Sequence, residues 1–449
     1  FTTNPGEGRS TPYATDVMKT NNSFIMHVNA DCPEHVDFAF KLAVEYRMKF
    51  KRDVVVDVSG YRKFGHNEQD MPKFTQPKSY ERVEKMTPMW KKYAAEIVKS
   101  GEFTQEEIDA RYNFHMEKMD QAFEKAKHEN FNHKDWDSST WKGILSPALK
   151  GEDHRSPVTK ISEDQFKTIG RKINTLPTKN FHPIIQKVYE QRLKAVETGQ
   201  GLDWAGAEAL AFASLLIEGF GVRLSGEDVR RGTFSHRHAC IIDQKDYFKY
   251  YPIRSVLTQD QEIKFQCFNS LLSEYGVLGF DYGYSIGNPN YLTIWEAQFG
   301  DFSNVAQPVI DQYIAGGERK WGVKSGLTLL LPHGYDGQGP EHSSARLERF
   351  LQLLDDDPYD PHFFESSAEK QTKLANMTIC NITEPANYFH VLRRQLHRTT
   401  YRKPLIILSP KRLLRLKEAK SDMKDFTETP KFREVIGEAT PNAIDEPKK

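Results

Sequence analysis

From about residue 201 onward, short apolar runs alternate with segments whose apolar residues recur at helical spacing. The first of these segments, Asp203–Glu218, is a predicted helix that ends at Gly219 and Gly221. The short runs are Val222–Leu224, Ala239–Asp243, Phe265–Phe268, Tyr291–Trp295, Leu327–Leu331, Met377–Ile382 and Pro404–Leu408. The helices predicted between them are Ser273–Tyr284, Asn304–Ile314, Ser343–Leu354 and Ala386–His397. Strands of about five residues separated by helices are typical of α/β proteins with a doubly wound parallel sheet.

The first 200 residues follow a different pattern. Pro33–Lys51 has helical periodicity, and the β-branched run Val54–Val58 after it predicts a strand that is buried on both faces. Long, charged helical segments then follow, with little strand pattern among them. They are Tyr80–Lys99, Gln105–Lys127 and Glu163–Glu197, with a loop-like stretch at Trp136–Arg155. This region is predicted to be a helical connector that is partly solvated.

Composition excludes several classes of protein. Lys plus Arg and Asp plus Glu each number 62, so the formal net charge is zero and gives no electrostatic footprint for nucleic acid. Hydrophobic residues make up 38% of the 449 residues, which argues against global disorder. Apolar stretches such as Ala209–Ala213 are far shorter than the ~20 residues that span a bilayer, so no membrane span is expected. The four cysteines are scattered, which argues against a disulfide scaffold and a structural zinc site.

Polar clusters follow several of the predicted strands. In an open α/β sheet, ligands bind beyond the carboxyl ends of the strands. The clusters are Gly65–Glu68, Gly232–His238, Ser273-Glu274, Glu296–Phe299, His333-Gly334 and Glu341–Ser344. Loops that carry His, Glu, Ser and Gly at one edge of a sheet favour an enzyme site.

Each cluster, taken alone, also has an ordinary structural explanation. His236 and His238 have a spacing that occurs in metal sites, but no third ligand is close in sequence, so no metal site is predicted. Glu274 fits an acid at a helix start, where the helix dipole favours it. Phe299 alone is better explained as a core residue. The common location of these residues, rather than any one of them, supports the functional interpretation.

A family resemblance rests on nine stretches between residue 10 and about residue 416. They are STPYATDV, HVNADCPE, YRKFGHNEQDMPKFTQP, RLSGEDVRRGTFSHRH, LLSEYGVLGFDYGY, IWEAQFGDFSNVAQPVIDQYI, LLPHGYDGQGPEHSSARLERFLQ, FHVLRRQ and RKPLIILSPKRLLR. In this order they resemble the thiamine-diphosphate-dependent decarboxylating components of the 2-oxoglutarate dehydrogenases. The resemblance implies an α/β, transketolase-like fold that binds thiamine diphosphate.

The resemblance also implies a division into domains. Residues 1–75 resemble the C-terminal part of the diphosphate-binding domain, residues 76–200 a helical connector, and residues 201–410 the pyrimidine-binding domain. Residues 411–449 resemble a linker towards a C-terminal domain that these residues do not include. The Gly-Asp-Gly and Asn-Asn-Gln motifs that bind the family's magnesium ion are also absent from residues 1–449. The Mg²⁺ ligands are therefore expected in a missing N-terminal region, and residues 1–449 alone are expected not to bind the cofactor.

Site residues follow from the same resemblance. By motif position, Glu274 resembles the acid that hydrogen-bonds the pyrimidine ring of the cofactor, and apolar neighbours such as Leu278 would favour the neutral acid that this role requires. Phe299 resembles the ring that stacks on the pyrimidine. His238 is the first candidate to hold the substrate carboxylate or to move a proton to the carbonyl oxygen. The second-tier candidates are His66, His236 and His342.

The implied activity is the oxidative decarboxylation of 2-oxoglutarate in the tricarboxylic acid cycle. The succinyl group would pass to the lipoyl arm of a dihydrolipoyl succinyltransferase, in a complex that also contains dihydrolipoyl dehydrogenase. The resemblance further implies a homodimer in the mitochondrial matrix, or in the cytoplasm of a bacterium. Two alternatives stay open at this point: a relative that acts on 2-oxoadipate, and a non-catalytic homologue that serves as a scaffold. The joint presence of Glu274, Phe299 and His238 favours an enzyme.

Overall fold

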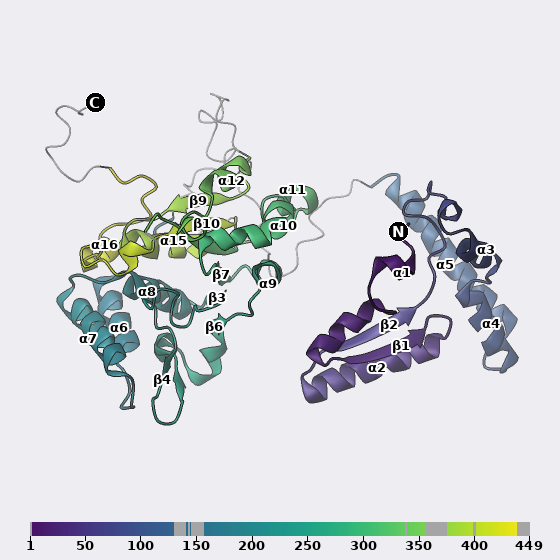
Figure 1. The fold of residues 1–449 in the computed structure, drawn as a ribbon, viewed down its shortest axis with the longest axis horizontal. Coiled ribbons are helices and arrows are strands. Elements are labelled where there is room, and N and C mark those ends of the chain that lie inside the picture. Colours follow the sequence, from purple (N-terminus) through teal and green to yellow (C-terminus); the bar gives the residue numbers. More distant parts are fainter. Residues whose placement is uncertain are drawn as a thin grey trace. The chain divides into compact units, whose positions relative to one another are not determined.

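The computed structural model describes residues 2–129, 141, 144, 157–336, 339–355, 375–397 and 401–437. The chain forms two compact units, unit 1 from Phe1 to Phe131 and unit 2 from Asn132 to Lys449 (Figure 1). Within the described ranges, no helix is both long enough and apolar enough to cross a membrane.

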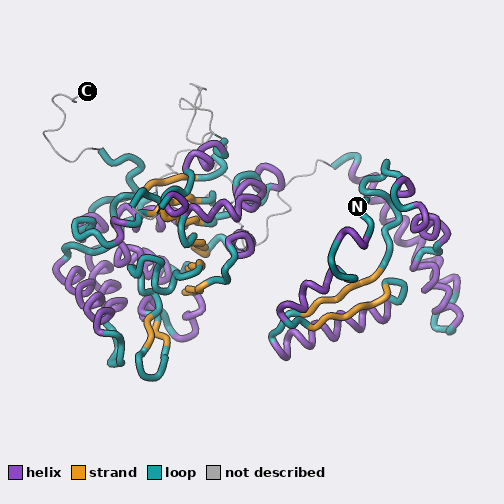
Figure 2. Tube along the Cα trace, viewed as in Figure 1, coloured by secondary structure: helices purple, strands orange, loops and turns teal. Residues whose placement is uncertain are grey.

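Unit 1 is built around two parallel strands that a helix connects. Strands β1 (Phe24–Asn29) and β2 (Val54–Ser59) pair along their whole length. Helix α2 (Pro33–Phe50) begins at a proline and ends before Lys51, whose φ of 54° is left-handed. Figure 2 shows α2 lying along the strand pair. The helix and the strand β2 confirm the predicted elements. The predicted burial of β2 on both faces is wrong, since its residues are half-buried or exposed in a sheet of only two described strands. Strand β1 was not predicted, because His27 and Asn29 interrupt its apolar pattern.

The rest of unit 1 is helical. Its elements are α1 (Pro5–Gly8), the 3₁₀ turns η1 (Ala14–Asn21) and η2 (Pro72–Phe74), α3 (Pro77–Lys85), α4 (Met89–Lys99) and α5 (Gln105–Ala126). The single helix predicted over Tyr80–Lys99 is wrong, since two helices meet there. Pro88 caps α4 and disfavours a helical conformation at Thr87, which breaks the helix.

Unit 2 contains a six-stranded sheet in which every pair of neighbours is parallel. Its strands are β3 (Gly221–Gly226), β6 (Phe265–Asn269), β7 (Tyr291–Glu296), β8 (Thr328–Pro332), β9 (Thr378–Asn381) and β10 (Leu405–Ser409). Their order across the sheet is β6-β3-β7-β8-β10-β9, so the direction of winding reverses beside β3. The predicted parallel sheet is confirmed.

Alternate residues of the strands enter two different cores. On β7, Leu292 and Ile294 pack with α8 (Trp204–Ile217), α15 (Pro385–His397) and α6 (Glu163–Asn174). Trp295 packs on the opposite face with α9 (Glu274–Gly287). A sheet that is covered by helices on both faces explains why its strands read as continuous apolar runs. The fold class is therefore α/β and doubly wound.

Several further elements complete unit 2 among the described residues. The helices are α7 (Pro183–Thr198), α10 (Gln307–Val309), α11 (Gly317–Trp321), α12 (Leu347–Gln352) and α16 (Met423–Thr427). The 3₁₀ and π turns are η5 (Pro252–Val256), η6 (Gln259–Lys264), η7 (Gly300–Ala306), η8 (Ile310–Ile314), η9 (Pro340–His342) and η10 (Arg412–Leu414). Strands β4 (Ile241–Ile242) and β5 (Lys249–Tyr250) form an antiparallel hairpin.

Two predicted regions look different in the structure. Helices α6 and α7, expected in a partly solvated connector, pack into unit 2; Gly170 of α6 approaches Val196 of α7 so closely that a Cβ atom at residue 170 would clash. Beyond residue 411, Phe426 and Phe432 are buried in the core with α8 and α15. The loop predicted at Trp136–Arg155 lies outside the described residues except for Trp141 and Ile144. The domain boundaries at 75, 200 and 410 stay predictions.

Removing side-chain volume from the centre of the sheet should destabilise unit 2. Ile294 is fully buried on β7, so Ile294→Ala is expected to lower the free energy of unfolding by ~2–5 kcal/mol. Urea unfolding of the full chain measures it. Ile184→Ala is the matched control, because Ile184 is 66% exposed and its loss should change stability by less than ~0.5 kcal/mol. Equal losses in the two variants would contradict this account of the core.

Candidate functional site

The carboxyl ends of the parallel strands place several polar residues at one edge of the sheet in unit 2. Glu227 directly follows β3, Glu274 follows β6 by a short loop, and Phe299 follows β7. His333 directly follows β8, and Lys411 follows β10. This edge, next to the point where the winding reverses, is where open α/β sheets bind ligands.

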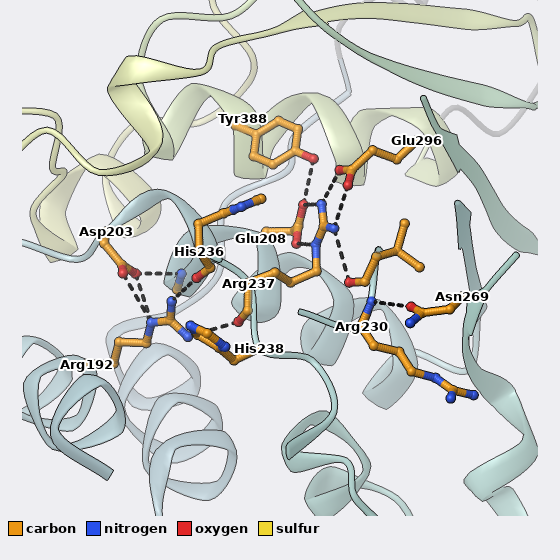
Figure 3. Close-up of polar contacts among 12 residues, drawn as sticks. Arg192, Asp203, Glu208, Arg230, His236, Arg237, His238, Asn269, Glu296 and Tyr388 are labelled. Carbon is orange, nitrogen blue, oxygen red and sulfur yellow. Dashed lines mark hydrogen bonds and ion pairs between the residues drawn. The ribbon is translucent and has the colours of Figure 1, made fainter. Parts of the chain in front are cut away.

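A buried arginine ties the loop after β3 to the rest of unit 2 (Figure 3). The Arg237 guanidinium donates from Nε to Glu208 Oε1 on α8 at 2.6 Å and from Nη1 to Glu296 Oε1 at the end of β7 at 2.9 Å. Nη2 contacts the second oxygen of each carboxylate, and Nη1 also donates to the Val229 carbonyl at 3.2 Å. All three ionised side chains are at least nine-tenths buried. Five N–H groups thus meet five acceptor contacts, the full capacity of a guanidinium.

The arrangement fixes the charge of Arg237. Burial opposes a charged guanidinium, but the carboxylates of Glu208 and Glu296 outweigh it and raise the pKa of Arg237 well above its ordinary value. Tyr388 of α15 donates its hydroxyl to Glu208 Oε2 at 2.8 Å. One interaction network therefore joins the loop after β3 to α8, β7 and α15.

His236 and His238 flank Arg237 and line a cavity of about 300 Å³. The cationic side chains that line the same cavity are Arg192, Arg415, Lys417 and Lys420. Burial and the charge of Arg192 lower the pKa of His238 to about 4. Burial together with Arg237 and Arg192 lowers the pKa of His236 well below its ordinary value. Both imidazoles are therefore neutral at neutral pH and can donate or accept a hydrogen bond.

Phe299 and His342 come together at the sheet edge. Their ring centroids are 4.6 Å apart in an edge-to-face arrangement, and Phe234 packs against the other side of the pair, 5.6 Å from Phe299. Lys411 lies 5.7 Å from the Phe299 ring and donates Nζ to the His342 carbonyl at 2.7 Å. Burial lowers the pKa of Lys411. The edge of the sheet thus offers an aromatic surface with a held ammonium group beside it.

Glu274 stands at the first turn of α9, where Ser273 caps the helix by accepting from the Gly276 N–H at 3.1 Å. The carboxylate is half-buried and lies close enough to Glu227 to influence it. Burial raises the pKa of Glu227, and the negative charges of Glu274 and Asp228 add to the effect. Leu278 is buried as expected, whereas Phe280 is 60% exposed. Two carboxyl groups of the sheet edge therefore interact electrostatically.

Gln298 joins two of these loops. Its Nε2 donates to Asp228 Oδ2 at 2.8 Å, and its Oε1 accepts from Thr233 Oγ1 at 3.0 Å. The loop after β7, which carries Phe299, is thereby fixed against the loop after β3, which leads to the histidines.

The structure brings together some of the predicted site residues. His236 shares a cavity with His238, and Phe299 contacts His342; the Phe234 ring connects the two pairs, since it also lies 6.4 Å from His236. Glu274 lies outside the lining of that cavity. His66 belongs to unit 1, where it is exposed in the loop after β2 and its carbonyl accepts from Arg62 at 2.9 Å. Within the described part of the chain, no three His, Cys, Asp or Glu side chains are placed to hold a metal ion.

Sequence reasoning missed the residues that organise the site. Arg237 was included in a cluster only as a neighbour of two histidines, and Glu208 was not singled out. The one pattern that could have revealed Glu208 is its position as a lone charge in an otherwise apolar helix, Trp204–Ile217. A charge in such a position needs a buried partner.

Comparisons with known proteins agree with the fold. Residues 200–417 match the family described as "Transketolase, pyrimidine binding domain", and residues 1–134 match "Dehydrogenase E1 component". Over 453 aligned residues the chain is 47% identical to "2-oxoglutarate dehydrogenase, mitochondrial" of Dictyostelium discoideum, covering 100% of this chain and 44% of that protein. The protein of the same name from Saccharomyces cerevisiae is 46% identical, covering 95% of this chain and 42% of that protein.

A third relative is "2-oxoglutarate dehydrogenase E1 component" of Brucella ovis, which is 45% identical over 438 residues. The match covers 97% of this chain and 41% of that protein. The chain therefore spans less than half the length of the curated relatives that it matches.

Breaking the buried ion-pair network should cost far more than breaking an exposed ion pair. Arg237→Gln leaves two buried carboxylates without a counter-charge, so the free energy of unfolding should fall by ~3–5 kcal/mol. Arg319→Gln is the control, because Arg319 is exposed and pairs with Asp355 at 3.3 Å, an interaction worth ~0–1 kcal/mol. Denaturant unfolding of the two variants measures the difference, and similar stabilities would contradict a structural role for Arg237.

Proposed function

Because the chain belongs to the family of the 2-oxoglutarate dehydrogenase E1 components, we propose that it takes part in the oxidative decarboxylation of 2-oxoglutarate. The observation that carries the proposal is the set of side chains at the carboxyl edge of the sheet in unit 2. An acid after β6, an aromatic ring after β7 and neutral histidines after β3 come from segments that are distant in sequence. Together they supply an acid, a stacking surface and proton-transfer groups.

The described residues fit one end of thiamine diphosphate. Glu274 is half-buried at the start of α9 and would hydrogen-bond the pyrimidine ring. Phe299, in the loop after β7, offers an aromatic face on which that ring would stack. When bound, the cofactor supplies through its thiazolium ring the electron sink that decarboxylation of a 2-oxo acid requires. We place the groups that bind the diphosphate of the cofactor, and the Mg²⁺ ligands of the holoenzyme, outside residues 1–449.

His238 is the proposed proton-transfer residue. A pKa of about 4 makes its imidazole neutral at neutral pH, so it contacts a substrate carboxylate or carbonyl through a hydrogen bond rather than through a permanent charge. His236 is more buried and has the weaker access. His342 supports the Phe299 ring, and His66 of unit 1 remains a second-tier candidate for the substrate.

The distal carboxylate of 2-oxoglutarate needs a cation, because an unpaired buried charge is costly. Arg237 is already saturated by its two glutamates. Arg415 lines the cavity beside His238, and its contact with the loop, to the Ser235 carbonyl at 3.4 Å, is long. We therefore assign the distal carboxylate to Arg415, with Lys417 as the neighbouring charge.

The proposed assembly is a homodimer within a larger complex. Exposed apolar side chains lie before and after Glu274 in the segment from β6 to α9; they are Phe268, Leu271, Leu272, Tyr275 and Phe280. A gathering of this kind on a surface is typical of a protein contact, and contact with a second subunit would shield the carboxylate from water. The partner that accepts the succinyl group would be the lipoyl arm of a dihydrolipoyl succinyltransferase, and dihydrolipoyl dehydrogenase would be a further partner in the complex. The relatives named as mitochondrial favour the mitochondrial matrix as the location.

Substitution of the proposed acid tests the role of Glu274. In the full-length enzyme, Glu274→Gln should keep the fold but lower turnover by about 10²–10⁴-fold, the general range for an acid–base group. Circular dichroism checks folding, and decarboxylation of 2-oxoglutarate measures turnover. Glu262→Gln is the control, since Glu262 lies on the exposed turn η6, which precedes β6, the strand that Glu274 follows. Turnover close to that of the unmodified enzyme would rule out the assignment of Glu274.

The choice of substrate tests Arg415. The unmodified enzyme should prefer 2-oxoglutarate to pyruvate in kcat/KM by a large factor. Arg415→Gln should reduce that preference by about 10- to 100-fold, the value of a hydrogen bond between charged groups, while the rate with pyruvate is nearly unchanged. Arg171→Gln, which breaks an exposed pair with Glu197, is the control. A better rate with pyruvate or 2-oxoadipate than with 2-oxoglutarate would preserve the family and overturn the proposed substrate.

A further inference from the structure

Helix α7 holds three successive backbone carbonyls of the loop that carries the histidines. Arg192 donates from Nη2 to the His236 carbonyl at 2.7 Å and from Nη1 to the Arg237 carbonyl at 3.2 Å. Tyr189 donates its hydroxyl to the His238 carbonyl at 2.8 Å. Tyr189 and Arg192 are three residues apart, so both side chains leave the same face of α7. Every carbonyl from residue 236 to residue 238 is thus bound by a side chain of one helix.

These two side chains are suited to a permanent role. Arg192 is 5% exposed, and its Nε reaches both oxygens of Asp203 at 3.1 and 3.2 Å, which balances the charge. Asp203 in turn caps α8 by accepting from the Gly206 N–H at 2.7 Å. Tyr189 is buried, and burial raises its pKa to about 12, so the phenol keeps its proton and remains a donor at neutral pH. The loop is therefore held by groups that do not titrate near neutral pH.

The loop needs such support because its backbone is strained. Ser235 has a φ of 51° and His238 a φ of 57°, both in the left-handed region. A residue other than glycine pays about 1–2 kcal/mol for this conformation and retains it only where the surroundings enforce it. On the other side of the loop, the N–H groups of Arg237 and His238 both donate to the Arg231 carbonyl at 3.0 Å. The φ of His238 determines the direction in which its imidazole leaves the backbone.

We propose that Tyr189 and Arg192 are positioning residues, which hold the backbone of His236–His238 in its strained conformation and so orient the imidazole of His238 towards the cavity. The inference rests on the proposed function only for what His238 then does to a substrate. The contacts of α7 with the loop stand independently of it. Figure 3 shows the Arg192 guanidinium between Asp203 and this loop.

Arg192 has a second effect, which is electrostatic. The groups that act on His238 are Arg192 and Arg415, which lower its pKa, and the Ser235 backbone and Asp203, which raise it; burial is the largest contribution and lowers it. His236 also faces His238 and is itself neutral. A variant that removes the charge of Arg192 should therefore raise the pKa of His238. A variant that keeps the charge but loses the guanidinium group, which binds two carbonyls at once, should leave that pKa unchanged.

Three variants of the full-length protein separate the two effects. They are Tyr189→Phe, which removes one hydrogen bond, Arg192→Lys, which keeps the charge, and Arg192→Gln, which removes it. Histidine C2–H deuterium exchange, read by peptide mass spectrometry without cofactor, gives the pKa of His238. Backbone amide exchange of residues 235–240 reports how firmly the loop is held. Tyr247→Phe is the matched control, since Tyr247 is 80% exposed.

We expect faster amide exchange of residues 235–240 in all three variants but not in the control Tyr247→Phe. The pKa of His238 should rise in Arg192→Gln and stay unchanged in Arg192→Lys and Tyr189→Phe. In the loaded enzyme, Tyr189→Phe should lower kcat/KM by roughly 2- to 12-fold, the value of one hydrogen bond. Since Tyr189→Phe removes only an oxygen atom, it remains informative if the Arg192 variants fold poorly.

The outcomes distinguish the positioning role from the proposed function. Unchanged amide exchange in Tyr189→Phe and Arg192→Lys overturns the positioning role, whatever the activity. Faster exchange with the predicted pattern of pKa values supports it, even if the unmodified enzyme shows no turnover of 2-oxoglutarate. In that case only the proposed function falls.

Discussion

The buried ion-pair network of Arg237 is the constraint on which the site depends. Glu208 lies in the middle of an apolar helix and Glu296 at the end of the central strand β7, where each is more than nine-tenths buried. Neither carboxylate could stay there without a cation, because the transfer of an isolated charge into the interior costs several kcal/mol. Arg237 reaches both only if its loop folds back over the end of β3. The two glutamates therefore dictate the path of the chain that carries the histidines.

This constraint explains how a strained loop can be part of a stable domain. A buried network with every donor satisfied has one arrangement, whereas a partly satisfied network is costly. The ion pairs of Arg237 with Glu208 and Glu296 hold the loop against the sheet and α8. Helix α7 holds the same loop through the carbonyls of His236 and His238. Helix α7 is therefore part of the structure that supports the site, and α6 packs closely against α7 at Gly170.

The sequence predicts the sheet well and the site only in part. Apolar runs such as Leu327–Leu331 are about five residues in length and leucine-rich or β-branched, and helices bury both of their faces, so their continuous apolar character and their length identify them as strands. Glu274 was correctly expected at a helix start, because the helix and its serine cap are local features. The network of Arg237 was not predicted, since its partners are 29 and 59 residues away in sequence. No local pattern indicates that pairing. Strand β1 was missed for a different reason, because His27 and Asn29 interrupt its apolar pattern.

The distribution of charge in the cavity has a consequence for catalysis. Arg237 is paired with two glutamates, whereas Arg192, Arg415, Lys417 and Lys420 line the cavity and give it a positive potential. Burial lowers the pKa of His238 most, and the charges of Arg192 and Arg415 lower it further. A dicarboxylate that enters brings negative charge next to the imidazole, and a nearby anion raises the pKa of a histidine. Binding of the substrate would then move the pKa of His238 upward, towards the range in which an imidazole transfers protons efficiently. If His238 transfers a proton as proposed, the cations that attract the anion would also keep its imidazole neutral until the anion binds.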